Sequence, residues 1–130
     1  MDSLLTPIFS HIFLCVLLYA LLTVARAPSV WGIGRKKDGT NPFQEIERRA
    51  SANLSNQFEW PLFFYVICVI LIVSGNQISS MQVYLAWLFV IGRYLHSYVQ
   101  VFTANVRLRG LVFTINFVAV LAMWGVHFYL

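Results

Sequence analysis

The sequence has few charged residues, few acidic residues and only two cysteines. Of its 130 residues, 11% are charged and 59% are hydrophobic, whereas soluble domains carry roughly 25% charged and 45–50% apolar residues. This shortage of charge excludes an ordinary soluble domain and indicates an integral membrane protein with a single domain, residues 1–130. Cys15 and Cys68 stand in separate apolar segments, so we interpret them as free thiols rather than as a disulfide or a metal site.

Motifs of the common soluble enzymes are also missing. The sequence contains no phosphate-binding loop, no metal-ligand cluster, no Ser/His/Asp pattern and no dinucleotide fingerprint. The formal net charge of +4 would favour nucleic acid only if the basic residues formed a solvated patch. They stand instead between apolar segments, where they report membrane topology. Any chemistry must therefore come from cations that act on a bound substrate.

Four long apolar segments predict helices that can cross a bilayer of about 30 Å. The first is preferred over a signal peptide because Asp2 is the only charge before it and because the segment exceeds the usual apolar run of about 7–15 residues. The second begins near Asn41 and Pro42 and contains Pro61, which predicts a kink. We expect an all-α integral membrane protein, a bundle of four transmembrane helices at about residues 4–25, 42–74, 81–105 and 110–129.

The basic residues concentrate in two connections. The first predicted connection, Arg26–Arg49, holds most of the Lys and Arg residues, and the predicted connection Val106–Arg109 holds two more. Cationic loops stay in the cytoplasm. Because both connections then lie on one side, we expect a multi-pass protein with both termini on the non-cytoplasmic side.

Several polar residues fall inside the predicted helices. Glu59 and Arg93 reach similar depths on adjacent antiparallel helices, and we expect them to pair, because an unpaired buried charge costs several kcal/mol. Helical spacing groups the others into three faces that converge near the cytoplasmic end: Arg49, Asn53, Asn56 and Glu59; Arg93, His96, Gln100 and Arg107; and Arg109, Thr114 and Asn116. The result would be a cation-rich pocket, open to the cytoplasm, for a small anion with several carboxylates.

Simpler interpretations exist for many of these residues. The Glu59–Arg93 pair is equally compatible with a structural lock, and His96 with hydrogen bonding inside the bundle. Arg107 is more simply a topogenic surface charge, and Asn116 is more often a contact between helices. His11 and His127 have no convergent partners in the sequence, so we interpret them as structural.

The pattern resembles the MAPEG family, the membrane-associated proteins of eicosanoid and glutathione metabolism. On the second helix the resemblance rests on Arg49, on Asn56-Gln57-Phe58-Glu59 and on Pro61. On the third, Gly92-Arg93-Tyr94-Leu95-His96 looks like the motif of the microsomal prostaglandin E synthase-like and bacterial members. Arg109 then stands at the spacing of the family's catalytic arginine. The resemblance covers nearly the whole chain.

The resemblance implies a homotrimer that binds glutathione between neighbouring subunits and acts on a lipophilic small molecule from the bilayer, as a transferase or peroxidase. Arg109 would be catalytic and would stabilise the glutathione thiolate. The glutathione-binding residues would be Arg26 from the neighbouring subunit, Arg49, Asn56, Glu59, Arg93, His96 and Thr114.

The chain departs from the family pattern at Ala52, Gln100 and Phe113, which replace an arginine and two tyrosines. These departures favour an alternative, a non-catalytic membrane protein of the same family that binds lipid or glutathione. A small multidrug exporter also has four short helices, but such proteins use an acidic residue in the first helix, and residues 4–25 contain none.

Overall fold

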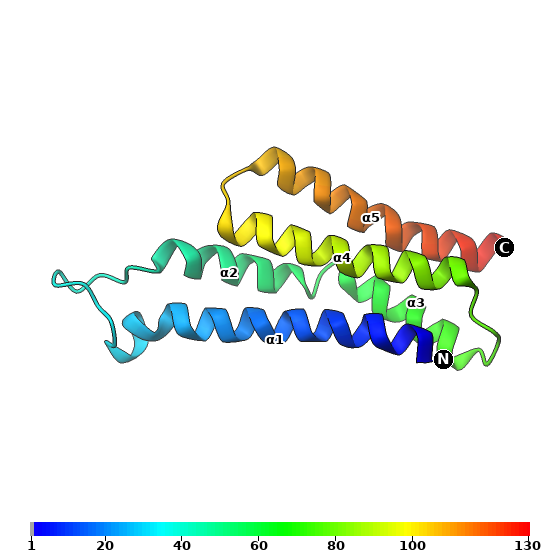
Figure 1. The fold of residues 1–130 in the computed structure, drawn as a ribbon, viewed down its shortest axis with the longest axis horizontal. Helices are drawn as coiled ribbons and strands as arrows, with labels where there is room; N and C mark the ends of the chain where they lie inside the picture. The colour runs from blue at the N-terminus through cyan, green and yellow to red at the C-terminus, as the bar shows by residue number, and fades with distance from the viewer. Residues whose placement is uncertain (1) are drawn as a thin grey trace.

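The computed structural model describes residues 2–130 as an elongated bundle of helices (Figure 1). The elements are α1 (Asp2–Trp31), α2 (Gln44–Asn56), α3 (Pro61–Val73), α4 (Ser80–Phe102) and α5 (Val106–Tyr129). Because α2 and α3 are the two halves of the predicted second helix, the expected four-helix arrangement is confirmed. Both termini lie at the same end of the bundle as the connection 74–79, and the connections 32–43 and 103–105 lie toward the other end.

Helix α1 extends six residues beyond its predicted end at Ala25. The helix includes Pro28 in its last turn, at the cost of one helical hydrogen bond. The helix ends before Gly32, whose φ of 75° is the left-handed conformation that terminates many helices. The prediction that a loop begins at Arg26 was therefore wrong, and the first connection comprises residues 32–43.

The kink predicted at Pro61 is confirmed, and it amounts to a break between α2 and α3. Pro61 is the first residue of α3, a position where its missing N–H is not needed. Between the two helices the chain makes tight turns, in which the Phe58 N–H donates to the Ser55 oxygen at 3.1 Å and the Glu59 N–H to the Asn56 oxygen at 3.3 Å. Phe58 and Glu59 are consequently exposed, whereas Gln57 is buried.

The boundary between α4 and α5 also differs from the prediction. Helix α4 ends at Phe102, and α5 begins at Val106, so the link predicted at Val106–Arg109 was wrong. The reason is a cap that the prediction overlooked: the Asn105 side chain accepts the Leu108 N–H at 3.0 Å, and such a cap starts a helix. Arg107 and Arg109 therefore lie in the first turns of α5.

The core consists of two apolar clusters. One joins α1, α3, α4 and α5 and includes Leu4, Phe64, Phe89, Val120 and Met123. The other joins α1, α2 and α4. Outside the core, most surface side chains of the helices are large and apolar. This is the pattern of a bundle that is surrounded by lipid.

Three helical segments within residues 2–130 are long and apolar enough to cross a membrane: Ser3–Trp31, Gln44–Val73 and Val106–Tyr129. Helix α4 differs from these three segments because it carries half of the buried polar side chains of the described residues: Gln82, Arg93, His96 and Ser97. The chain is thus an integral membrane protein with a polar interior along α4.

Candidate functional site

Gln57 is the centre of a buried hydrogen-bond network. Its amide oxygen accepts from Arg93 Nε at 3.2 Å and lies 2.8 Å from His11 Nε2. Its amide nitrogen donates to Asn53 Oδ1 at 3.0 Å and to Ser97 Oγ at 3.1 Å. An amide has two acceptor positions and two donors, so Gln57 is fully satisfied. The break between α2 and α3 makes this possible, because it directs Gln57 inward.

The network continues in both directions from Gln57. On one side, His11 Nδ1 lies 2.5 Å from the Tyr65 hydroxyl. On the other, Asn53 Nδ2 donates to Gln100 Oε1 at 2.8 Å and contacts His96 Nδ1 at 3.4 Å. We call these residues, together with Arg93, the central network: His11, Asn53, Gln57, Tyr65, Arg93, His96, Ser97 and Gln100.

Arg93 is fully buried, and it is incompletely satisfied. The predicted Glu59–Arg93 pair was wrong: Arg93 binds Gln57, and no ion pair between Arg93 and Glu59 occurs within 4.0 Å. The physical reason is the turn at residues 57–60, which carries Glu59 to the surface. Within residues 2–130, neither Nη1 nor Nη2 of Arg93 has a hydrogen-bond partner. An acceptor from outside the chain would complete this guanidinium.

The predicted polar face of the second helix divides at the same turn. Asn53 is completely buried, Asn56 is half-buried and Glu59 is exposed. A single face would require an uninterrupted helix, but α2 ends at Asn56. Asn53 and Gln57 therefore face α4, whereas Asn56 and Glu59 do not join the central network.

A second polar region, the basic cavity, opens at the end of the bundle that carries the connection 32–43. It has a volume of about 300 Å³ between α2, α4 and α5. The residues that line it are Arg48, Arg49, Ala52, Val99, Gln100, Thr103, Ala104, Asn105, Val106 and Arg109. Three guanidinium groups surround it and no carboxylate lines it. This arrangement suits an anion.

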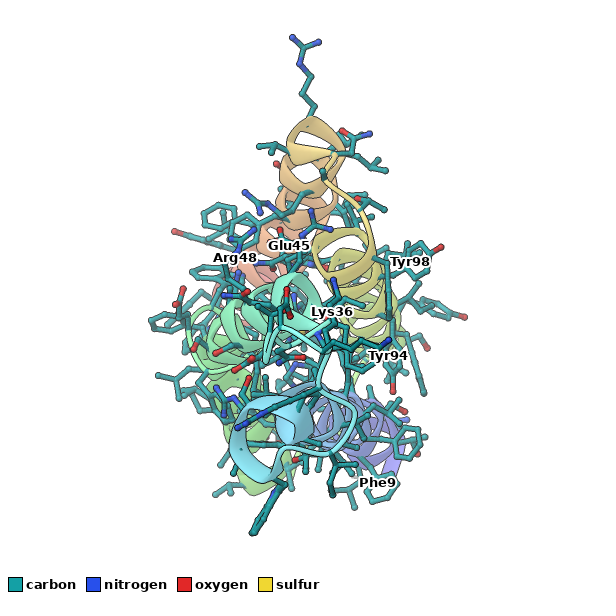
Figure 2. The ribbon with its side chains drawn as sticks, turned by 90° about the vertical axis from the view of Figure 1, so that its left-hand side faces the viewer. Phe9, Lys36, Glu45, Arg48, Tyr94 and Tyr98 are labelled. Atoms are coloured by element: carbon teal, nitrogen blue, oxygen red, sulfur yellow. The ribbon has the colours of Figure 1, made fainter. Side chains whose placement is uncertain are left out.

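Glu45 compensates part of this positive charge from outside the cavity. Arg49 Nε donates to Glu45 Oε1 at 3.0 Å, and Arg48 pairs with the same carboxylate. Figure 2 looks onto this end of the bundle and shows Glu45 beside Arg48. Arg109 has no ion-pair partner within 4.0 Å among the described residues. It also lies in the first turn of α5, where the helix dipole disfavours a cation, so it does not stabilise the helix.

The other predicted site residues lie outside the basic cavity. Arg26 is exposed and pairs with Glu47 at 3.2 Å, and Asn56 and Glu59 do not line the cavity. Thr114 is exposed and donates to the Gly110 oxygen at 2.9 Å. The chain thus brings Arg49 and Arg109 together and places Arg93 and His96 in the adjacent central network.

The family model for MAPEG matches residues 4–129, nearly the whole chain. The chain belongs to the MAPEG family. Searches of the curated proteins and of the solved structures give no match. Family membership and the apolar helices agree, since MAPEG proteins are membrane proteins, and the family generally uses glutathione.

The positions where this MAPEG chain differs from the expected pattern lie at or next to the basic cavity. Ala52 and Gln100 line it. Phe113 packs beside His96, with ring centroids 5.9 Å apart. Gln100 also accepts a hydrogen bond from Asn53, so it connects the cavity to the central network.

Four members of the central network were missed as polar partners in the sequence: His11, Gln57, Tyr65 and Ser97. Two of their bonds join residues 46 and 54 positions apart: His11 to Gln57 and His11 to Tyr65. His11 lies on α1, whereas Gln57 follows α2 and Tyr65 lies on α3, so the spacing within a single helix gave no signal for these contacts. The remaining signal was chemical, because a histidine within an apolar membrane segment requires partners.

Proposed function

We propose that this MAPEG protein is a membrane-bound, glutathione-dependent transferase or peroxidase that acts on lipophilic electrophiles. The observation that carries the proposal is the basic cavity, where Arg49 and the unpaired Arg109 meet without a carboxylate in the lining. Glutathione carries two carboxylates, and planar guanidinium groups bind carboxylates with two parallel hydrogen bonds. The residues of the cavity therefore fit this tripeptide.

Arg109 is the proposed catalytic residue. Glutathione bound in the cavity supplies a thiol of pKa about 8.5, which is mostly protonated at pH 7. The cationic Arg109 side chain and the free N–H groups at the start of α5 would favour the thiolate, which is the nucleophile. The α5 N-terminus also holds Arg107, but that residue is exposed and lies outside the cavity.

A homotrimer would complete this site. The amino group of glutathione needs an acceptor, and the lining of the cavity contains no carboxylate. Glu59 is exposed in this chain, and an exposed carboxylate within a membrane-spanning segment is costly unless another group covers it. We infer that Arg26, Asn56, Glu59 and Thr114 reach the cavity of a neighbouring subunit, while Arg93 and His96 contribute from the same chain.

The proposed orientation places the basic cavity at the cytoplasmic face. Every Lys and Arg except Arg93 belongs to the connection 32–43 or to the adjoining ends of α1, α2 and α5. Positive charge is retained on the cytoplasmic side. Both termini would then lie on the opposite side, and the cavity would meet cytoplasmic glutathione.

A non-catalytic protein that binds lipid or glutathione is the second candidate. It is favoured by Ala52, Gln100 and Phe113, because these residues supply neither a cation nor the expected hydroxyl groups beside the basic cavity. Calorimetric titration with glutathione separates the two candidates at the first step. Binding without turnover would support a glutathione-binding protein, and the absence of heat would support a lipid-binding one.

The decisive experiment compares Arg109→Ala with Arg107→Ala in the purified protein. The assay follows conjugation of glutathione to 1-chloro-2,4-dinitrobenzene, a lipophilic aryl halide. We expect Arg109→Ala to lower the turnover about a hundredfold, the cost of removing one electrostatic stabiliser. Arg107→Ala removes the same charge two residues away and should change the turnover less than about twofold. Equal rates in both variants would remove Arg109 from the mechanism.

A further inference from the structure

Three side-chain amides connect the buried Arg93 to the basic cavity. Arg93 Nε contacts the amide of Gln57 at 3.2 Å. Two further contacts join Gln57 to Asn53 at 3.0 Å and Asn53 to Gln100 at 2.8 Å. Arg93, Asn53 and Gln57 are buried. Gln100 is half-buried and lines the cavity. We call the amides of Gln57, Asn53 and Gln100 the amide relay, which runs from a buried cation to the cavity wall.

The hydrogen bonds of the amide relay have one direction. Arg93 Nε can only donate, so the Gln57 atom that it contacts is the amide oxygen. The Gln57 nitrogen consequently faces Asn53 and donates to its oxygen. In the same way, the Asn53 nitrogen donates to the Gln100 oxygen. The orientation of the Gln100 amide is thus determined by Arg93, three hydrogen bonds away, and not by the cavity itself.

This direction leaves a donor at the basic cavity. The Gln100 oxygen is occupied by Asn53, and within residues 2–130 the Gln100 nitrogen makes no hydrogen bond. That nitrogen is not among the enclosed atoms that lack a partner, so it is accessible. Because Gln100 lines the cavity, its N–H groups are available to a ligand there. The opposite orientation would present an oxygen, which repels an anion.

The amide relay also brings the effect of the Arg93 charge to the cavity wall. Arg93 itself is completely buried and does not line the cavity. Hydrogen bonds that point in one direction polarise one another, and buried groups are screened much less than exposed ones. The guanidinium at one end therefore makes the Gln100 amide a stronger donor at the other end. The relay thus adds positive potential to a cavity in which Ala52 supplies no cation.

We propose that the amide relay makes Gln100 an anion-binding residue of the basic cavity, and that Gln57 and Asn53 are the positioning residues that fix its orientation. The Gln100 N–H donates to a carboxylate of the ligand, beside the guanidinium groups of Arg49 and Arg109. This inference deepens the proposed function and rests on it, because glutathione is the carboxylate ligand proposed for this cavity. It also gives the departure at Gln100 a role as a donor.

The test reverses the amide relay from outside the cavity. Gln57 does not line the basic cavity, and Gln57→Glu keeps the size of the side chain. A carboxylate can only accept, so it pairs with Arg93 and also accepts from the Asn53 nitrogen. The amides of Asn53 and Gln100 then rotate, and Gln100 presents its oxygen to the cavity. We expect glutathione to bind about thirtyfold more weakly, the effect of losing one charge-assisted hydrogen bond.

A double-mutant cycle separates orientation from charge. Gln100→Leu removes the donor and should weaken glutathione binding about tenfold. Its matched control is Gln44→Leu, because Gln44 is exposed on α2 and lies outside the basic cavity. Adding Gln57→Glu to Gln100→Leu should weaken binding by less than about twofold more, since no Gln100 amide is left to reverse. A further thirtyfold loss would show that Gln57→Glu acts by charge alone and would overturn the proposal.

Nuclear magnetic resonance of the full chain in detergent, with isotope-labelled glutamine, gives a second readout. The side-chain N–H signals of Gln100 are identified by their loss in Gln100→Leu. They should shift when glutathione is added to the wild type and stay unchanged in Gln57→Glu. If glutathione binds to the wild type without shifting them, Gln100 is not a ligand-binding residue and the proposal is wrong. If Gln57→Glu does not fold by circular dichroism, Gln100→Leu and the wild-type shift still decide.

The same signals distinguish this proposal from the proposed function. Glutathione that shifts the Gln100 signals but is not turned over counts against the proposed reaction alone. If glutathione does not bind, the proposed function is wrong, and citrate, a small tricarboxylate, becomes the probe of the basic cavity. Citrate that shifts the Gln100 signals supports the amide relay, and citrate that leaves them unchanged overturns it.

Discussion

The central network and the basic cavity are both polar, yet they differ in how their groups are satisfied. In the central network, Gln57 uses all four of its hydrogen-bonding positions within the chain. In the basic cavity, Arg48 and Arg49 share the carboxylate of Glu45, and Arg109 has no ion-pair partner among the described residues. Buried polar groups with complete partners stabilise one structure. Cations without complete partners are available for a ligand.

The comparison predicts that the two regions respond differently to mutation. Changes in the central network should lower stability, because each removed group leaves a buried partner unsatisfied. Changes in the basic cavity should alter ligand affinity and leave stability almost unchanged, because exposed ion pairs contribute little. Arg93 combines the features of both regions. Its Nε donates to Gln57, as in a satisfied network, whereas its two terminal nitrogens have no hydrogen-bond partner within residues 2–130.

Gln57→Leu should have the largest effect. It removes four hydrogen bonds at once and leaves the buried Arg93 without its partner, so we expect the free energy of unfolding to fall by about 3 kcal/mol. Unfolding by a denaturing detergent, followed by circular dichroism, measures this loss. Gln77→Leu, in the exposed connection 74–79, is the control and should change stability by less than about 0.5 kcal/mol. Equal effects would mean that the central network is not a stabilising element.

Gly92→Ala should have the second-largest effect on stability, because α4 and α5 approach closely at Gly92. A Cβ at this position would lie 2.0 Å from Asn116 Oδ1, so the buried Asn116 would have to move. We expect a loss of about 2 kcal/mol in the free energy of unfolding, typical of overpacking. Gly125→Ala on α5 meets nothing within 4 Å and should be neutral or stabilising by up to about 1 kcal/mol. A neutral Gly92→Ala would show that Asn116 has room to rotate.

The sequence was sufficient to predict the four-helix arrangement, because apolar length and the position of basic residues are one-dimensional properties. It was also sufficient for the kink, since Pro61 acts on the backbone locally. Arg49 and Arg109 were predicted together because each stands at the same end of its helix. Their meeting in one cavity follows from topology without knowledge of side-chain direction.

The direction of Glu59 could not be predicted in this way. The face of the second helix was extrapolated through residues 57–60, where the helical repeat is interrupted. The interruption exchanged Glu59 for Gln57 as the partner of Arg93. The predicted end of α1 was wrong for a different reason, because the helix continues through Arg26 and Pro28 to Trp31.

Arg49→Gln should weaken glutathione binding by about tenfold, because it removes a charge-assisted hydrogen bond from the basic cavity. Arg48→Gln is the matched control, since both arginines pair with Glu45, but the Arg48 side chain is 69% exposed whereas that of Arg49 is 25% exposed. We expect a loss of about twofold or less for Arg48→Gln. Calorimetric titration at low and high salt measures both. Equal losses would indicate only a general effect of charge on the surface.

Glu45→Gln should have the smallest effect, and its sign should be opposite. The Glu45 carboxylate competes with any anion for Arg48 and Arg49, so its removal should strengthen glutathione binding by about twofold. Asp38→Asn is the control of equal charge. Hydrogen bonds from the hydroxyl and the N–H of Thr40 hold the pKa of Asp38 below its usual range, so the control also removes a full negative charge at neutral pH.

The same titration distinguishes two roles of Glu45. If Asp38→Asn strengthens binding equally, the effect is one of net charge and not of the pair with Arg49. If Glu45→Gln weakens binding, the carboxylate positions Arg49 for the ligand, as Gln57 positions Arg93 in the central network. In that case Glu45 would hold Arg49 in place before the anion binds. A fixed cation loses less side-chain entropy when an anion binds, so the pair would strengthen binding.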